Sequence, residues 1–244
     1  FLNEDLRVIA PDLRGLGDSE RTMDRDCYLK QELAKDVIEI MDNLGLDRFF
    51  LAGHDWGGAV AQEVALAVPE RVTRLVIMNI PVITNIKGNV EALKVMQSRG
   101  SVPLWYQYFQ QQPQLAEAMI PGNEEVWIRY FFGKAGLEGR IPEDAISEYI
   151  RCYSIESTPA TGASYYRTLK EDTKRWKELA GTKFSMPSLY IYGNRDVVII
   201  PEYLSHIYEC FDDIKVVEVD AEHFLQEEKP ETVANILNDF LDDH

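Results

Sequence analysis

The segment at positions 49–59 reads FFLAGHDWGGA and constrains this chain more than any other part of the sequence. Four apolar residues lead into a glycine-rich turn, and a helix-forming stretch, 57–68, follows it. Asp55 stands at the apex of the turn, and the glycines on both sides let a strand and a helix approach each other closely. The pattern therefore predicts a strand, a strained turn that presents Asp55, and a helix.

An aspartate at such a turn favours one kind of chemistry. A carboxylate cannot form an ordinary acyl-enzyme, but it can displace a leaving group from a carbon atom. The product is an alkyl ester, which water must then cleave. We therefore expect attack on an electrophilic sp³ carbon, as in an epoxide or an alkyl halide.

Strand and helix patterns alternate along much of the chain and predict an α/β fold with a mostly parallel sheet covered on both faces. Apolar residues recur at helical spacing in 29–44 and again after Pro230 near the C-terminus. The segments that read as strands are 6–10, 49–52, 75–80, 188–192 and 216–219.

Residues 85–181 break this alternation. They are rich in aromatic residues and helix formers and contain no convincing strand pattern. We interpret 85–181 as a helical lid, or cap, inserted into a core formed by 1–84 and 182–244.

Charge and cysteine content narrow the classes of partner and compartment. A formal net charge of −16 argues against nucleic acid or an anionic membrane as a partner. No apolar run is long enough to predict a membrane span. The three cysteines are far apart and odd in number, which favours a reducing compartment, so we expect a cytoplasmic protein. No metal-ligand spacing, phosphate loop or dinucleotide fingerprint occurs, so we expect no metal and no cofactor.

Polar residues follow two more of the predicted strands. Asp196 comes just after 188–192, and His223 comes just after 216–219. Because the carboxyl ends of parallel strands meet at one edge of a sheet, we expect both side chains near Asp55. His223 would deprotonate water, and Asp196 would fix its tautomer and stabilise the imidazolium.

The other histidines are poorer candidates for the base. His54 adjoins Asp55 in the turn, but we expect its side chain to point away from it and to have a structural role. His206 and His244 are expected to be exposed to solvent. The backbone N–H of Trp56 is a plausible donor to the oxyanion that forms when water attacks an ester on Asp55.

These residues resemble the α/β-hydrolase-fold epoxide hydrolases of the haloalkane dehalogenase-like superfamily. GHDWGG and the order nucleophile, acid, histidine match that family, and DLRGLGDS at 12–19 matches its R-G-x-G-x-S segment. In the lid, YQYFQ at 106–110 resembles the family's Y-F-Q segment, and GASYYR at 162–167 resembles its G-x-x-[WY]-Y-R region. By that match the lid tyrosines are Tyr108 and Tyr166, with Tyr165 as the rival to Tyr166.

The resemblance implies an epoxide hydrolase that converts a small hydrophobic epoxide into a vicinal diol. An ester on Asp55 would be hydrolysed by water that His223 activates. Opening an epoxide leaves an alkoxide, and two phenols with a reference pKa of about 10 can hydrogen-bond that oxygen and then protonate it.

The sequence departs from the family at two places. An upstream H-G-x-P turn, which normally supplies a second oxyanion donor, is not found. The strand that carries it would lie between 6–10 and 49–52, so we expect a hole in the sheet of this chain, which would lack the usual N-terminal strands. The second departure is Glu222, where relatives often have glycine before the histidine.

Other functions remain open from the sequence. A haloalkane dehalogenase shares the fold, the aspartate and the histidine, and in it the indole N–H of Trp56 would bind the departing halide. A haloacid dehalogenase of the fluoroacetate type is a further alternative. A non-catalytic ligand-binding protein of the same fold is the alternative from a different class.

Overall fold

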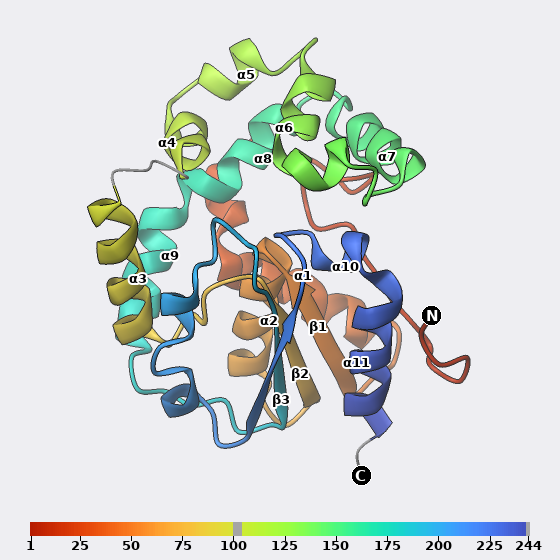
Figure 1. The fold of residues 1–244 in the computed structure, drawn as a ribbon, viewed down its shortest axis with the longest axis vertical. Helices are drawn as coiled ribbons and strands as arrows, with labels where there is room; N and C mark the ends of the chain where they lie inside the picture. The colour runs from red at the N-terminus through yellow and green to blue at the C-terminus, as the bar shows by residue number, and fades with distance from the viewer. Residues whose placement is uncertain (100–103, 243–244) are drawn as a thin grey trace.

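A parallel four-stranded sheet forms the centre of the computed structural model, which describes residues 1–99 and 104–242 (Figure 1). The strands are β1 (Phe49–His54), β2 (Val72–Met78), β3 (Ser188–Gly193) and β4 (Ile214–Val219), in the order β1-β2-β3-β4. The helices are η1 (Arg25–Tyr28), α1 (Lys30–Asn43), α2 (Trp56–Ala67), α3 (Ile86–Ser98), α4 (Trp105–Gln111), α5 (Leu115–Met119), α6 (Glu124–Leu137), α7 (Glu143–Tyr153), α8 (Thr158–Arg167), α9 (Leu169–Glu178), η2 (Pro201–Leu204), η3 (Ile207–Cys210), α10 (Leu225–Glu228) and α11 (Pro230–Asp242).

The two faces of the sheet are covered by different helices. Along β2, Leu75 and Ile77 belong to the core cluster that includes residues of α1 and α2. Val76 and Met78 point the other way and pack with residues of α11. This alternation follows from the two-residue period of a strand, and it makes the central strands apolar on both faces. The predicted α/β fold with a parallel sheet is confirmed.

Most of the predicted core elements are present, but the predicted strand at 6–10 is wrong. The helix expected over 29–44 is α1, and the stretch expected over 57–68 is α2. Residues 6–10 are irregular, and Val8 is 62% exposed. β1 is the edge of the sheet among the described residues, and the segment 6–10 pairs neither with it nor with another described strand. An extended segment without a partner strand has no hydrogen bonds to hold it.

The segment predicted to be a lid is helical. Residues 86–178 contain the helices α3 to α9, and none of the strands in the described part of the chain falls among them. The helices α4 to α8 lie above the carboxyl ends of the strands, whereas α3 and much of α9 lie beside the sheet (Figure 1). The division into a core and a lid at 85–181 stays a prediction. Within the described residues, no helix is both long and apolar enough to cross a membrane.

Arg140, between α6 and α7, joins the lid to the segment that follows β4. Its guanidinium pairs with Glu222, 2.5 Å away, and also with Glu228 on α10. The Glu228 side chain is fully buried and accepts a hydrogen bond from the backbone N–H of Glu222 at 2.8 Å. The unusual Glu222 is therefore one partner in an ion-pair cluster between lid and core.

The turn after β1 is as tight as the sequence predicts. Asp55 has φ 48° and ψ −128°, which is a strained conformation for a residue with a side chain. A Cβ atom at Gly53 would lie 2.4 Å from the carbonyl oxygen of Gly57, so the strand and the helix can meet only if Gly53 has no side chain. A Cβ atom at Gly57 would have no atom within 4 Å.

These contacts predict opposite effects for two glycine substitutions in the same turn. Gly53→Ala must displace backbone and should lower the free energy of unfolding by about 1–3 kcal/mol. Gly57→Ala is the matched control, and it should leave stability unchanged or raise it, by up to about 1 kcal/mol. Urea unfolding of both variants measures the difference. Equal stabilities of the two variants would contradict the packing described for this turn.

Candidate active site

Three side chains from three strand ends meet beneath the lid. Asp55 follows β1, Asp196 follows β3, and His223 follows β4. Nδ1 of His223 lies 2.7 Å from Oδ2 of Asp196, and Nε2 lies 3.2 Å from Oδ2 of Asp55. The structure thus brings together the three residues that the sequence singles out, with the imidazole between two carboxyl groups.

The charges of this group depend on one another. Burial alone would lower the pKa of His223, but Asp196 and then Asp55 stabilise the imidazolium and raise the pKa to about 10. Burial would raise the pKa of Asp55, but the hydrogen bond and the charge of His223 outweigh it and the pKa falls below its ordinary value. The two shifts act in the same direction, since each favours an ion pair between a protonated His223 and the Asp55 carboxylate.

Backbone N–H groups hold both carboxylates. The N–H of Trp56 also favours the charged form of Asp55, which lies at the N-terminus of α2. Oδ1 of Asp196 accepts from the N–H groups of Val198 at 2.7 Å and Ile199 at 3.1 Å. Because the Asp196 side chain is fully buried, these bonds replace the water that a free carboxylate would bind.

Asn79, directly after β2, fastens the segments that carry Asp196 and His223. Its side-chain amide donates to the carbonyl groups of Glu222 at 3.1 Å and His223 at 2.9 Å. Its Oδ1 accepts from the N–H of Gly193 at 2.8 Å. Asn79 is fully buried and has φ 40°. Sequence reasoning missed this residue, although an asparagine just past a strand end is a known candidate for positive φ.

His54 contacts the backbone of His223 and has a structural role. Its Nε2 lies 2.8 Å from the carbonyl oxygen of His223, and its Nδ1 lies 3.4 Å from the amide of Gln226. Burial, and then the positive charge of His223, lower the pKa of His54 to about 4, so the ring is neutral. His206 lies away from the site and pairs with Glu91 and Glu209. His244 is outside the described residues.

Two tyrosines from the helices above the sheet lie close to Trp56, the residue that follows Asp55. Tyr166 on α8 packs edge-on against Trp56, with ring centroids 5.2 Å apart, and against Tyr106 on α4 at 5.7 Å. Burial, and then the charge of Asp55, raise the pKa of both phenols above the ordinary value. Both hydroxyl groups therefore stay protonated over the physiological pH range and lie within the field of the Asp55 carboxylate.

Of the two tyrosines on α4, Tyr106 is the buried one and Tyr108, the one that the sequence predicts for the site, is exposed. Tyr106 is only 9% exposed, whereas Tyr108 is 64% exposed on the outer face of α4. Two residues that are two positions apart on a helix point in nearly opposite directions, so only one of them can face the site. Tyr165, the rival to Tyr166, donates from its hydroxyl to the carbonyl of Arg14 at 2.8 Å. Tyr106 was missed because YQYFQ offers two tyrosines and no signal for the buried face.

Trp56 lies between the tyrosines and a buried lysine that sequence reasoning also missed. The Nζ atom of Lys30 lies 4.1 Å from the centre of the Trp56 ring. The indole Nε1 of Trp56 is buried and has no hydrogen-bond partner among the described residues. No feature of the sequence around Lys30, which begins an ordinary amphipathic helix, distinguishes it from an exposed lysine.

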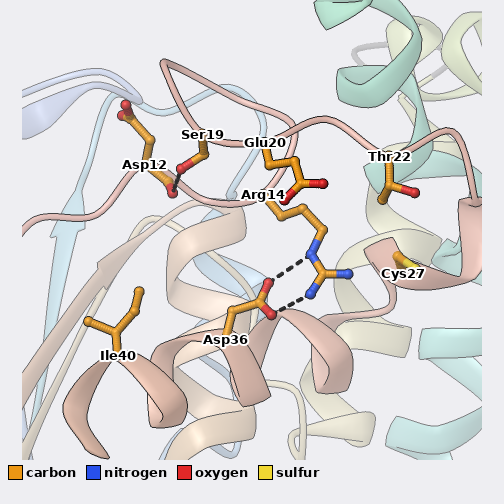
Figure 2. A pocket seen from close by; sticks show the side chains of 8 residues that line it. All are labelled: Asp12, Arg14, Ser19, Glu20, Thr22, Cys27, Asp36 and Ile40. Atoms are coloured by element: carbon orange, nitrogen blue, oxygen red, sulfur yellow. Dashed lines mark hydrogen bonds and ion pairs between the residues drawn. The ribbon is translucent and has the colours of Figure 1, made fainter. Parts of the chain in front are cut away.

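A hollow of about 470 Å³ opens elsewhere, between α1 and the loop that precedes it. Figure 2 shows Arg14 reaching from this loop to Asp36 on α1, where the guanidinium and the carboxylate form two hydrogen bonds. The hollow is not lined by Asp55, Asp196 or His223. It is therefore distinct from the candidate active site. Among the described residues, no group of three or more His, Cys, Asp or Glu side chains could hold a metal ion.

Comparison with known proteins places most of the chain in one family. A model of the alpha/beta hydrolase fold family matches residues 1–230. The soluble epoxide hydrolase of a Corynebacterium species is 31% identical and is matched over 98% of this chain and 82% of its own length. Bifunctional epoxide hydrolase 2 of Mus musculus is 29% identical over 96% of this chain, and the chain spans only 46% of that protein.

A solved structure agrees with these sequence matches. The M145A mutant of an epoxide hydrolase from Bacillus megaterium superimposes with a TM-score of 0.80 at 26% identity, covering 95% of this chain and 82% of that one. The strand order, the turn at Asp55 and these matches lead to one conclusion. The chain belongs to the alpha/beta hydrolase fold family, in the group that includes the soluble epoxide hydrolase of Corynebacterium.

Proposed function

We propose that this protein is an epoxide hydrolase that opens a small hydrophobic epoxide through an ester on Asp55. The observation that carries the proposal is the pair of phenols, Tyr106 and Tyr166, that adjoin each other near the Asp55 carboxylate. An attacking carboxylate that faces two proton donors fits a substrate whose carbon is attacked while its oxygen receives a proton. The matches to proteins named epoxide hydrolases support the same reaction.

In the first step, Asp55 attacks a ring carbon and the carbon–oxygen bond of the epoxide breaks. Tyr106 and Tyr166 hydrogen-bond the departing oxygen, and one of them gives it a proton. We thus propose Tyr106 in place of Tyr108 for this role. Residues 85–181 would form the lid that carries both phenols over the core. The aromatic rings around them favour an apolar substrate.

In the second step, His223 first loses its proton to solvent and then takes a proton from water, and the resulting hydroxide attacks the ester carbonyl. The bond between the carbonyl carbon and the diol oxygen breaks, and that oxygen takes the proton of the new carboxyl group, which restores the Asp55 carboxylate. Before the reaction, two carboxylates hold the proton on His223. The ester on Asp55 carries no negative charge, so forming it removes one of these two carboxylates and makes His223 easier to deprotonate. The proton that His223 loses to solvent before it acts as a base balances the proton that one lid tyrosine gave to the epoxide oxygen, so that tyrosine regains its proton from solvent. Asp196 keeps the imidazole ring oriented, and the backbone N–H of Trp56 stabilises the oxyanion.

The dehalogenase alternative uses the same aspartate and is favoured by one observation, the buried indole N–H of Trp56 without a partner. Halide release would need that donor but neither phenol. Product analysis separates the two functions, because an epoxide gives a diol and a haloalkane gives a halide ion. We expect a diol from styrene oxide and no halide from a chloroalkane.

Replacing His223 should trap the ester. With His223→Ala, the first step continues and the second stops, so the mass of the substrate should appear on the peptide that contains Asp55. Asp55→Asn is the matched control and should carry no adduct. Mass spectrometry of the digested protein after incubation with an epoxide makes the measurement. If His223→Ala bears no adduct with any epoxide or haloalkane, the protein is a binding module rather than an enzyme of this kind.

The two steps should differ in their dependence on pH. At about pH 5 a larger fraction of His223 in the ester stays protonated and cannot act as a base. Asp55 remains ionised there, because the pKa of its carboxyl group is lowered. We therefore expect more ester at about pH 5 than at about pH 8 when turnover is quenched with acid and the protein is weighed. An ester fraction that is equal at both pH values would contradict the proposed role of His223.

The lid tyrosines give a third test. Tyr106→Phe and Tyr166→Phe should each lower the rate constant of ester formation by about 10- to 100-fold, since each removes one proton donor. Tyr108→Phe, two residues along the same helix, should change it by less than about twofold. Stopped-flow tryptophan fluorescence or quenched mass spectrometry measures the rate. A loss with Tyr108→Phe as large as that with Tyr106→Phe would overturn this assignment.

A further inference from the structure

Lys30, the first residue of α1, is a buried charged group that the proposed reaction does not use. Its side chain is fully buried, and it pairs with Asp172 of α9, which is also buried, at 3.0 Å. Burying two charges costs free energy unless each has a full set of hydrogen-bond and charge partners, so the partners of Lys30 decide whether its charge is stable there.

The surroundings of Lys30 fit an ammonium ion. Its Nζ donates to Oδ2 of Asp172, to Oγ1 of Thr168 at 3.0 Å, and to the carbonyl oxygen of Tyr165. Three acceptors match the three N–H donors of an ammonium, whereas a neutral amine would have only two. Burial lowers the pKa of Lys30, and the negative charge of Asp172 opposes that effect.

Two aromatic rings also face the ammonium, that of Tyr165 at 5.5 Å and, closer, that of Trp56, which follows Asp55 in the chain. Nζ lies over the face of Trp56, 4.1 Å from its centre, and the other contacts of Trp56 lead to Tyr166. The indole N–H of Trp56 is buried without a hydrogen-bond partner among the described residues, and its ring meets the Tyr166 ring at 77°. Burial raises the pKa of the Tyr166 phenol, and the Trp56 side chain opposes that rise. A cation on the face of an indole attracts its π electrons and leaves the N–H more positive.

We propose that Lys30 is a positioning residue of the active site: clamped by Asp172, it fixes the Trp56 ring and polarises its N–H toward the hydroxyl of Tyr166. The effect reaches the substrate only through Trp56 and Tyr166. A better-supported phenol gives its proton more readily to the opening epoxide, so the role belongs to ester formation and not to ester hydrolysis. This inference rests on the epoxide opening proposed above.

The test removes both buried charges together, so that neither is left without its partner. Lys30→Met/Asp172→Asn is the main variant, and Lys30→Gln/Asp172→Asn is the second in case the first does not fold. Lys35→Met is the matched control, because Lys35 lies on the same helix but is exposed and pairs with Glu32. Each is made in the wild-type chain and in a Trp56→Phe background.

In the wild-type background, the charge-free pair should form ester about tenfold more slowly, with the rate of ester hydrolysis unchanged. In the Trp56→Phe background, the same pair should have no further effect, because the polarised N–H is already gone. Lys35→Met should match its parent in both. An equal loss in both backgrounds, or no loss in either, would overturn the inference and leave Lys30 with a purely structural role.

A spectroscopic measurement keeps this inference separable from the proposed function. In protein labelled with ¹⁵N-tryptophan, the indole signal that disappears with Trp56→Phe belongs to Trp56. Its proton should move upfield when the buried charges are removed, while the other three indole signals stay in place. An unmoved Trp56 signal overturns the role of Lys30 even if no epoxide reacts. An absence of ester in the wild-type protein, with the signal moved, counts against the proposed reaction alone.

Discussion

A single imidazolium shared by two carboxylates is the interaction on which this site depends. His223 lies between Asp55 and Asp196, and each charge makes the burial of the others tolerable. Removing any one of the three changes the proton affinity of the rest. This coupling sets the order of the two proposed steps. Esterification of Asp55 removes one of the carboxylates that stabilise the imidazolium, and His223 can then lose its proton and act as a base.

The surrounding structure keeps these three groups in register. Parallel strands bring the three strand ends to one edge, and the fully buried Asn79 binds the segments that follow β3 and β4. His54 holds the backbone of His223, and the turn at Gly53 strains Asp55 into position. None of these contacts depends on a substrate. Contacts of this kind, all within the protein, hold the three groups in place and favour stabilisation of charge as it develops.

The core of the fold and the proximity of Asp55, Asp196 and His223 were predictable from the sequence because both follow from local patterns. Strand periodicity located the sheet, and the positions of Asp55, Asp196 and His223 just after predicted strands brought them to one edge. The prediction of a strand at 6–10 failed for a non-local reason, since an apolar segment forms a strand only when another strand pairs with it. The burial of Tyr106 and Lys30 was not predictable for a similar reason. Their burial depends on Tyr166 and Asp172, which are distant in sequence.

The ion-pair cluster at Arg140 has a practical consequence for redesign. The helices α4 to α8 are an attractive target for exchange, since they lie above the strand ends while Asp55, Asp196 and His223 follow strands of the sheet (Figure 1). Here the guanidinium that neutralises the buried Glu228 and contacts Glu222, beside His223, comes from the segment to be exchanged. A transplanted lid without an equivalent cation would leave an unbalanced carboxylate next to the base. Chimeras of this protein will therefore require matched residues on both sides of the junction.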